Sequence, residues 1–158
     1  MKKRIVVGIV GLPLRRKNGK LEFLLTQRYA PHNKQWHLKW QPAGGGLEFG
    51  ETPEQCVIRE FKEELSVTSI ILYPHPIVKT STWEHGNDDS QIATHVILPC
   101  YLISIGQQKV KINDPDHETA QAEWFTHNQI KKLDTLPNTL SYIEDTIALV
   151  KINKIAII

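Results

Sequence analysis

The chain has 158 residues, of which 41% are hydrophobic and 23% are charged. This length allows a buried core without disulfides or a structural metal, and we expect a single domain over residues 1–158. The formal net charge of +2 is too small to argue for a nucleic-acid or membrane partner.

Two sequence features indicate where the protein resides. Cys56 and Cys100 are too few and too far apart for a disulfide scaffold or a zinc site, so we interpret them as buried thiols in a reducing compartment. The apolar run at residues 5–14 is short, and no cleavage site of small residues follows it. We therefore predict neither a signal peptide nor a membrane span, and a cytoplasmic protein. The basic stretches at residues 1–4 and 14–17 are interpreted as solvated ends of a strand and a turn.

The N-terminal third predicts strands followed by a loop. Residues 4–12 and 21–28 are rich in β-branched and apolar side chains and predict a hairpin whose turn lies in residues 15–19. Residues 29–46 contain two prolines and end in three glycines, which predicts a loop without regular structure. An edge strand near the N-terminus could pair two subunits, so the oligomeric state stays open and a homodimer is one alternative.

A helix is predicted from Pro53 to about Leu65. Thr52 is a suitable N-cap, proline is favoured at the first helical position, and Gln55 completes a capping box with Thr52. Three apolar residues at a spacing of four form a stripe that we expect to face the core: Val57, Phe61 and Leu65.

Beyond this helix, residues 69–83 and 94–105 predict further strands, joined by a loop at Gly86, Asn87, Asp88 and Asp89. Residues 121–126 predict a short strand that runs into a helix capped by Thr126 and Gln129 and ended by Pro137. Apolar residues recur at helical spacing from Thr139 and predict a C-terminal amphipathic helix: Leu140, Ile143, Ile147 and Val150. This order of elements predicts one mixed α/β domain.

The predicted helix over residues 53–65 carries an unusual group of carboxylates. Glu60, Glu63 and Glu64 lie at i, i+3 and i+4, where like charges destabilise a helix by roughly 0.2–0.5 kcal/mol per pair. The neighbouring cations are Arg59 and Lys62, and we expect neither to lie between the carboxylates. Divalent cations held by carboxylate oxygens would offset the repulsion. Three glutamates alone are also common on solvated helix surfaces, but here a glycine run precedes them.

These residues together resemble the Nudix box. The family pattern is Gly, five residues, Glu, seven residues, and then Arg-Glu-apolar-any-Glu-Glu-any-Gly-apolar. This sequence matches it at eight places: Gly45, Glu51, Arg59, Glu60, Phe61, Glu63, Glu64 and Val67. The one departure is Ser66, where the family has Gly. Trp40, the stretch at residues 44–51 and the stretch at residues 122–126 extend the resemblance beyond the box.

The resemblance implies a MutT-like Nudix hydrolase: an α/β/α sandwich around a mixed sheet, with a loop-helix-loop catalytic motif. Such enzymes cleave a nucleoside diphosphate linked to another group, by attack of water on phosphorus, with Mg²⁺ or Mn²⁺. The resemblance assigns metal binding to Glu60, Glu63, Glu64 and the Gly44 carbonyl. It also implies that Glu51 and Arg59 pair to fix the loop on the helix.

The identity of the general base stays open at the sequence level. Glu63 or Glu60 is the first candidate, since proton removal from water needs a carboxylate near the metal. Many family members use a Glu from a downstream loop as metal ligand or base, which here matches residues 113–124. Glu118 is the predicted residue there, with Glu123 as the alternative.

Two other functions are alternatives to hydrolysis of a small nucleotide, and the sequence does not identify the substrate. One is a nucleotide-binding regulatory module without catalysis, which would not need three crowded carboxylates. The other is hydrolysis at the 5′ end of RNA, against which the absence of a basic stripe counts. Trp36 or Trp83 could stack on a base, although such residues more often fill a core.

Overall fold

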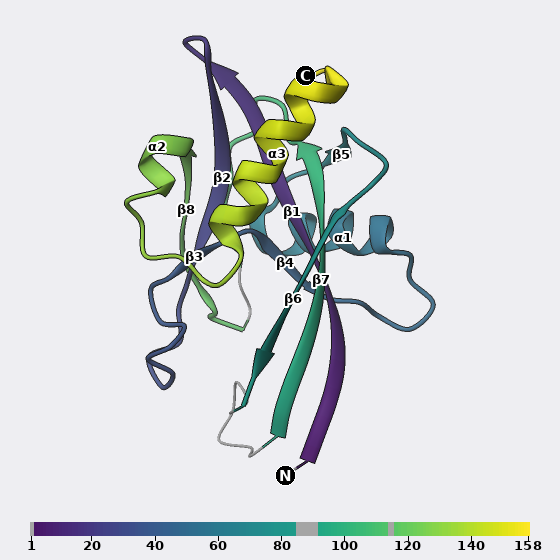
Figure 1. Ribbon diagram of the computed structural model, residues 1–158, viewed down its shortest axis with the longest axis vertical. Coiled ribbons are helices and arrows are strands. Elements are labelled where there is room, and N and C mark those ends of the chain that lie inside the picture. Colours follow the sequence, from purple (N-terminus) through teal and green to yellow (C-terminus); the bar gives the residue numbers. More distant parts are fainter. Residues whose placement is uncertain (1, 85–91, 114–115) are drawn as a thin grey trace.

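The computed structural model describes residues 2–84, 92–113 and 116–158. Within them the chain forms an eight-stranded sheet and three helices (Figure 1). The strands are β1 (Lys2–Lys17), β2 (Lys20–Arg28), β3 (Trp40–Gln41), β4 (Ala43–Gly46), β5 (Ile70–Ile71), β6 (Ile77–Trp83), β7 (Ile92–Ser104) and β8 (Thr119–Thr126). The helices are α1 (Pro53–Leu65), α2 (His127–Ile130) and α3 (Thr139–Asn153).

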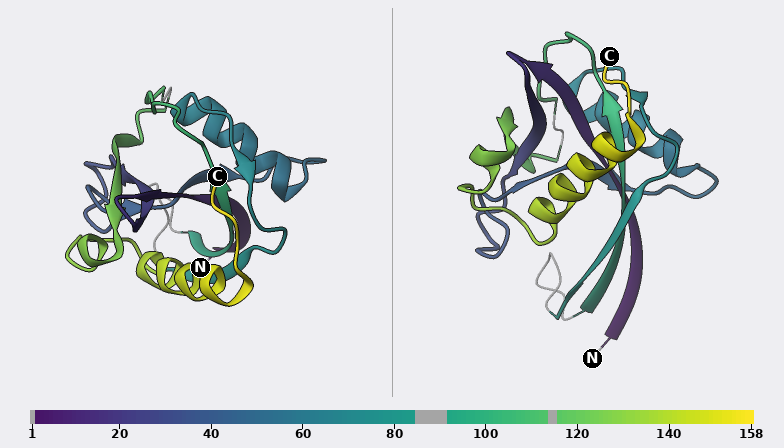
Figure 2. Two further views of the ribbon diagram at one scale, coloured as in Figure 1. Left: turned by 90° about the horizontal axis from the view of Figure 1, so that it is seen from above. Right: turned by 45° about the horizontal axis from the view of Figure 1, so that its top comes forward.

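The sheet is mixed and is covered on both faces. β1 pairs with β7 in parallel, whereas the other strand pairs are antiparallel. α1 lies against one face and α3 against the other (Figure 2). Alternate residues of β7 divide between the two cores: Tyr101 and Ile103 face α1, while Cys100 and Leu102 pack with α3. The predicted α/β/α sandwich around a mixed sheet is confirmed.

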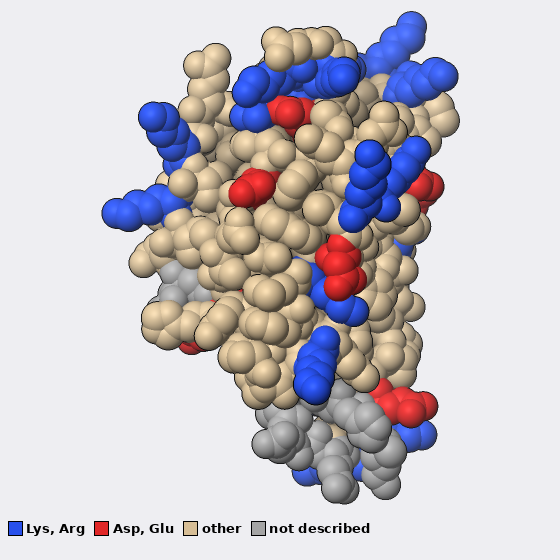
Figure 3. Space-filling view, turned by 90° about the vertical axis from the view of Figure 1, so that its left-hand side faces the viewer, with Lys and Arg blue, Asp and Glu red and all other residues tan. Residues whose placement is uncertain are grey.

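β1 is much longer than predicted, and the hairpin turn is correspondingly shorter. The strand continues to Lys17, which pairs with Lys20, so the turn consists of Asn18 and Gly19 alone. Both have positive φ, 52° and 75°, as a two-residue hairpin turn requires. Lys and Arg gather at the upper end of the face in Figure 3, where this hairpin lies in Figure 1. The expected solvated ends are confirmed by the exposed Arg16 and Lys17.

The predicted loop over residues 29–46 is wrong at its C-terminal end, where β3 and β4 form. Gly44 of β4 lies opposite Val10 of β1. A Cβ on Gly44 would lie 2.0 Å from the Ile9 carbonyl oxygen, so only glycine allows the two backbones to approach this closely. The glycine run predicts a turn from local sequence alone, but it forms a strand because it pairs with β1, which is distant in sequence.

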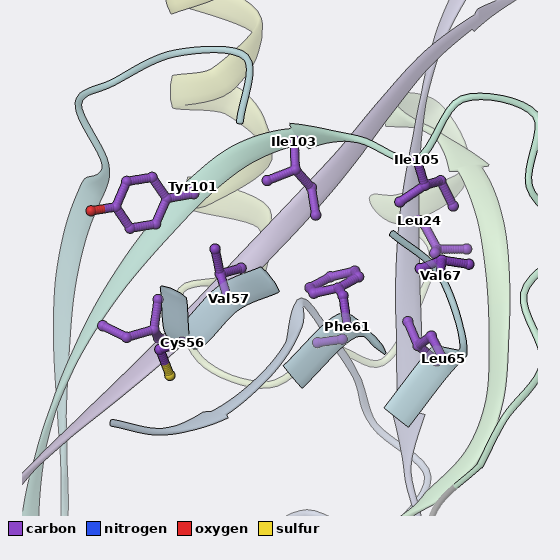
Figure 4. Close-up of a cluster of buried hydrophobic side chains, with 11 residues drawn as sticks. Leu24, Cys56, Val57, Phe61, Leu65, Val67, Tyr101, Ile103 and Ile105 are labelled. Atoms are coloured by element: carbon purple, nitrogen blue, oxygen red, sulfur yellow. The ribbon is translucent and has the colours of Figure 1, made fainter. Parts of the chain in front are cut away.

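Helix α1 has the predicted limits. The Thr52–Gln55 capping box is present, with Gln55 N–H donating to the Thr52 hydroxyl at 3.1 Å. The predicted stripe of Val57, Phe61 and Leu65 is buried, and Cys56 beside it is buried as well. Figure 4 shows Val57 and Phe61 facing Ile103 of β7. This packing fixes α1, and therefore its remaining face, relative to the sheet.

The strand predictions downstream of α1 are largely confirmed. Residues 69–83 contain two strands, β5 and β6, rather than one, and residues 94–105 lie mostly in β7. The expected loop at Gly86, Asn87, Asp88 and Asp89 lies outside the described residues. α3 begins at Thr139, as predicted.

α2 is shorter than predicted. Its Thr126–Gln129 capping box is present, but the helix ends at Ile130 and not near Pro137. The chain that follows is held along β3 instead: Trp40 N–H donates to the Asp134 carbonyl at 2.9 Å, and Leu136 N–H donates to the Trp40 carbonyl at 2.9 Å. These long-range hydrogen bonds take the place of further helical ones.

Both cysteines are buried free thiols, as expected. In the described part of the chain, no helix combines the length and apolar character that a membrane span needs.

Replacing Ser66 with glycine is expected to stabilise the protein. Ser66 ends α1 with φ 58° and ψ 34°, a left-handed conformation in which its Cβ is strained. Ser66→Gly should raise the free energy of unfolding by about 1 kcal/mol, and the melting temperature by about 2–4 °C. Thermal unfolding followed by circular dichroism measures this change.

Ser141→Gly is the matched control, because Ser141 lies inside α3, where glycine is unfavourable, and it should lower the melting temperature. A Ser66→Gly variant that melts at or below the wild-type temperature would show that the left-handed residue carries no strain.

Candidate active site

The site is organised by the Arg59 guanidinium of α1. Arg59 Nε and Nη2 donate to the two oxygens of the Glu51 carboxylate at 2.6 and 3.0 Å, and Nη2 also donates to the Gly46 carbonyl at 3.2 Å. One side chain thus links the helix to the loop before it and to the end of β4. The implied Glu51–Arg59 pair is present in a bidentate geometry, which is the strongest form of this contact.

Arg59 also reaches the carboxylates of α1, contrary to the expectation that no cation lies between them. Its Nη1 donates to Glu60 Oε1 at 2.8 Å and to Glu63 Oε2 at 3.2 Å. The long arginine side chain folds back over the helix because Glu51 holds its other edge. The repulsion between Glu60 and Glu63 is therefore already partly offset by the protein itself.

The same cation leaves Glu51 and Glu60 with opposite pKa shifts. Hydrogen bonds from Arg59 lower the pKa of Glu51 to about 2, against its burial, and the Glu48 N–H helps at 3.2 Å. Burial raises the pKa of Glu60 above its usual value in spite of Arg59, and the charges of Glu63 and Glu51 add to this shift. The charged form of Glu60 is thus less favoured than that of a solvated glutamate.

Glu60 is pressed against β4. A Cβ on Gly45 would lie 2.4 Å from the Glu60 carboxyl carbon, so glycine at this box position makes room for the carboxylate. The Gly45 and Gly46 carbonyls also approach the helix, at 3.9 and 3.6 Å from the Cys56 sulfur. Gly44, the residue implied as a carbonyl ligand, lies one position earlier in the same strand.

Glu64 and Glu118 have different partners, although a neighbour of Glu118 contacts Glu64. Glu64 Oε1 accepts a hydrogen bond from the Thr119 hydroxyl at 2.6 Å, a contact that no sequence pattern predicted. Glu118, one residue before Thr119, forms an ion pair with Arg28 at 3.3 Å and is 53% exposed. The structure therefore brings the 118–119 segment to Glu64, with the Glu118 carboxylate turned to Arg28.

Glu123, the alternative to Glu118, lies on the other face of the sheet from α1. It is paired in register with Leu25 of the α3-side core, whereas its neighbour Trp124 is paired with Leu24 on the α1 side. Strand alternation thus directs Glu123 away from the carboxylates of α1.

The donor set of this site suits a divalent cation. Carboxylate and carbonyl oxygens are the ligands that Mg²⁺ prefers, and Glu60 is a half-buried carboxylate whose pKa is raised by loss of solvation. Glu63 is 61% exposed and has room to turn. Within residues 2–84, 92–113 and 116–158, however, no three His, Cys, Asp or Glu side chains converge closely enough to hold an ion as they stand. Binding would require Glu60 and Glu63 to turn from Arg59.

Cys56 is not a candidate nucleophile. Its thiol is buried, and burial together with the Glu51 carboxylate raises its pKa to about 12. The thiol therefore stays protonated at neutral pH. This agrees with its interpretation as a core residue.

A cavity of about 290 Å³ lies on the α3 side of the sheet. It reaches the site at Gly46, and its floor consists of alternate residues of β1 and β7: Val6, Gly8, Val10, Val96 and Leu98. Trp36 and Trp83 form one wall, with an edge-to-face contact at 4.9 Å between ring centroids. Both tryptophans weighed as stacking residues thus line this cavity.

Comparison of the chain with known proteins identifies related sequences and structures. A family model of the NUDIX domain matches residues 4–145. Over 69 residues, covering 43% of this chain and 47% of the relative, the chain is 41% identical to "8-oxo-dGTP diphosphatase" of Escherichia coli (strain K12). Over 73 residues, covering 45% of this chain and 49% of the relative, it is 42% identical to "Bis(5'-nucleosyl)-tetraphosphatase [asymmetrical]" of Caenorhabditis elegans. The chain spans about half of the length of the curated relatives that it matches.

A solved C. elegans Ap4A hydrolase binary complex has a similar fold. Its TM-score is 0.69 at 23% identity, with 92% of this chain and 98% of that chain covered. At this identity the likeness concerns the fold alone.

Removing the Glu51 carboxylate should change how stability depends on pH. Because the pKa of Glu51 is lowered from 4.5 to about 2, the folded state binds this proton less readily than the unfolded state. The stabilisation is therefore complete above pH 4.5 and is lost as the pH falls toward 2. The difference in free energy of unfolding between wild type and Glu51→Gln should shrink across this window.

Urea unfolding in EDTA at several pH values between 2 and 6 measures this difference. A difference that stays constant from pH 5 to pH 2 would contradict the pairing of Glu51 with Arg59.

Proposed function

The chain belongs to the NUDIX family, and from this premise we propose that it is a metal-dependent hydrolase that cleaves a diphosphate linkage in a nucleoside di- or triphosphate derivative. The observation that carries the proposal is the carboxylate face of α1, fixed by Arg59 to Glu51 and Gly46 at the edge of a nucleoside-sized cavity. The names of the two curated relatives, a diphosphatase and a dinucleoside tetraphosphatase, support the same class of substrate.

NUDIX hydrolases generally need a divalent metal ion, and we propose Mg²⁺ or Mn²⁺ here. Glu60, Glu63 and Glu64 would hold it, with the Gly44 carbonyl and Glu118 as further ligands. When bound, such an ion neutralises phosphate charge and lowers the pKa of a coordinated water. The crowded carboxylates would otherwise repel a diphosphate, so the donor set and the anionic substrate both require cations in between.

The residues of this chain would supply binding, orientation and a proton acceptor. Glu60 or Glu63 would accept the proton of the attacking water, with Glu118 as the alternative once it leaves Arg28. Because its pKa is raised, the Glu60 carboxylate is a better proton acceptor than an ordinary glutamate. Arg59 and Glu51 act as positioning residues, because they orient the helix and the loop without a role in proton transfer.

The nucleoside would lie in the cavity beside Gly46. Its floor of valine and leucine side chains and its wall of Trp36 and Trp83 suit an aromatic base, which can stack on an indole ring. The phosphates would then leave the cavity at Gly46, where they meet the carboxylates of α1.

Glu64→Gln should abolish hydrolysis while leaving the fold intact. The substitution keeps the shape of the side chain but removes a charged ligand, and we expect the rate to fall by about 100-fold or more. The assay is Mg²⁺-dependent release of phosphate or pyrophosphate from a panel of nucleoside triphosphates, ADP-ribose, dinucleoside polyphosphates and sugar nucleotides, with EDTA as the metal-free reference.

Glu144→Gln is the matched control, because Glu144 lies on α3 beside His127 and should keep the wild-type rate. A Glu64→Gln variant with full activity would refute the assignment of the metal site. Wild-type protein that hydrolyses no compound of the panel, yet binds nucleotides, would indicate a regulatory module instead.

Trp83→Ala should weaken binding of the nucleoside. Loss of one base-stacking ring typically costs about 1–3 kcal/mol, so KM for the best panel substrate should rise by about tenfold or more. Trp83→Phe keeps an aromatic face and should retain most of the affinity. An unchanged KM in Trp83→Ala would show that Trp83 only packs against Trp36.

A further inference from the structure

Glu64 is held at both its backbone and its side chain by residues that precede or begin β8. At the C-terminal end of α1, Asn113 N–H donates to the Glu64 carbonyl at 2.8 Å, and Lys111 N–H donates to the Leu65 carbonyl at 3.0 Å. The Thr119 hydroxyl donates to Glu64 Oε1 at 2.6 Å. These contacts fix the last turn of the helix and one of its carboxylates together.

A β-bulge directs Thr119 toward α1. In β8, Ala122 packs against the core on the α1 side, and strict alternation from it would turn Thr119 to the opposite face. The register between β8 and β2 shifts between Gln27 and Arg28, however, and leaves Ala120 as an extra residue in β8. One extra residue reverses the alternation and re-aims the side chain before it. The hydroxyl of Thr119 reaches α1 as a consequence.

The carboxylates of α1 are held by donors of different charge. Glu60 and Glu63 accept hydrogen bonds from the Arg59 guanidinium at 2.8 and 3.2 Å, so a cation that approached them would compete with a positive charge already in place. The hydroxyl that donates to Glu64 is neutral, and its hydrogen bond is strengthened by the charge of the carboxylate that accepts it. Thr119 therefore holds this carboxylate in place without neutralising it.

We propose that Thr119 is a positioning residue, which orients the Glu64 carboxylate toward the divalent cation. Hydrogen bonds from surrounding residues fix the orientation of metal ligands, and their loss typically weakens metal binding by about 10–100-fold. A side chain that is already oriented also loses less conformational entropy when the cation binds. The inference rests on the proposed function, which supplies Glu64 as a metal ligand.

The test is binding of Mn²⁺ in the absence of substrate, followed by the electron paramagnetic resonance signal of the free ion. Thr119→Val removes the hydroxyl but keeps a side chain branched at Cβ, and its dissociation constant for Mn²⁺ should rise about tenfold or more. Thr119→Ser keeps the hydroxyl and should bind Mn²⁺ nearly as tightly as wild-type protein does.

The two substitutions separate positioning from strand stability. Valine suits a β-strand better than serine does, because it is branched at Cβ. A purely structural role would therefore make Thr119→Ser the more damaging change, which is the reverse of the order expected for Mn²⁺ binding. Thermal unfolding in EDTA measures the stability of each variant apart from the metal.

Thr82→Val is the matched control, because it removes a hydroxyl from an exposed position of another strand, β6, and should keep the wild-type affinity for Mn²⁺. Glu64→Gln is the reference for the metal site itself, and it should weaken Mn²⁺ binding at least as much as Thr119→Val does.

Wild-type affinity in Thr119→Val, or an equal loss in Thr119→Val and Thr119→Ser, would overturn the positioning role and leave the metal site standing. Wild-type protein that binds no Mn²⁺, or a Glu64→Gln variant that binds it as tightly as wild type, would instead remove the proposed metal site, and the positioning role with it.

Discussion

The structure of the site depends on one guanidinium group. Arg59 is shared among Glu51, Glu60 and Glu63, and it also holds the Gly46 carbonyl. Without a cation at this point, several carboxylates would face one another on a helix that must pack closely on β4. The pKa shifts follow from how this guanidinium is shared: the pKa of Glu51 falls because its carboxylate accepts two N–H groups, while loss of solvation raises the pKa of Glu60.

The glycines of β4 connect this charge balance to the fold. Gly44 permits the β1 backbone to approach, and Gly45 leaves the space that the Glu60 carboxylate fills. Adjacent residues in one strand point to opposite faces, so a single short segment serves both the sheet and the helix. Substitution at either glycine would therefore separate the carboxylates from the sheet edge on which their geometry depends.

Features specified by neighbouring residues could be predicted from the sequence, and features specified by distant residues could not. The start of α1 was predicted because the Thr52–Gln55 capping box is a local signal. The N-terminal extension of β1, at Lys2 and Lys3, depends on parallel pairing with β7, and the early end of α2 depends on hydrogen bonds to Trp40. Neither partner lies within the windows from which propensities are inferred.

The same distinction separates the chemistry of the site from its recognition of a substrate. The Glu51–Arg59 pair and the three carboxylates of α1 come from one continuous segment, so their spacing alone indicated a common role. The reach of Arg59 to Glu60 and Glu63 was missed, because it depends on a rotamer that Glu51 imposes.

The walls of the cavity combine β1, β6, β7 and the segment before β3, which only the tertiary structure brings together. In β1, strand alternation directs Val6, Gly8 and Val10 into this cavity. A change of substrate could thus arise from substitutions scattered over these elements while α1 and its charge balance stay intact. Since loops and strand ends tolerate such changes better than a crowded helix face does, the cavity walls are the part of this structure in which substitutions disturb the charge balance of α1 least.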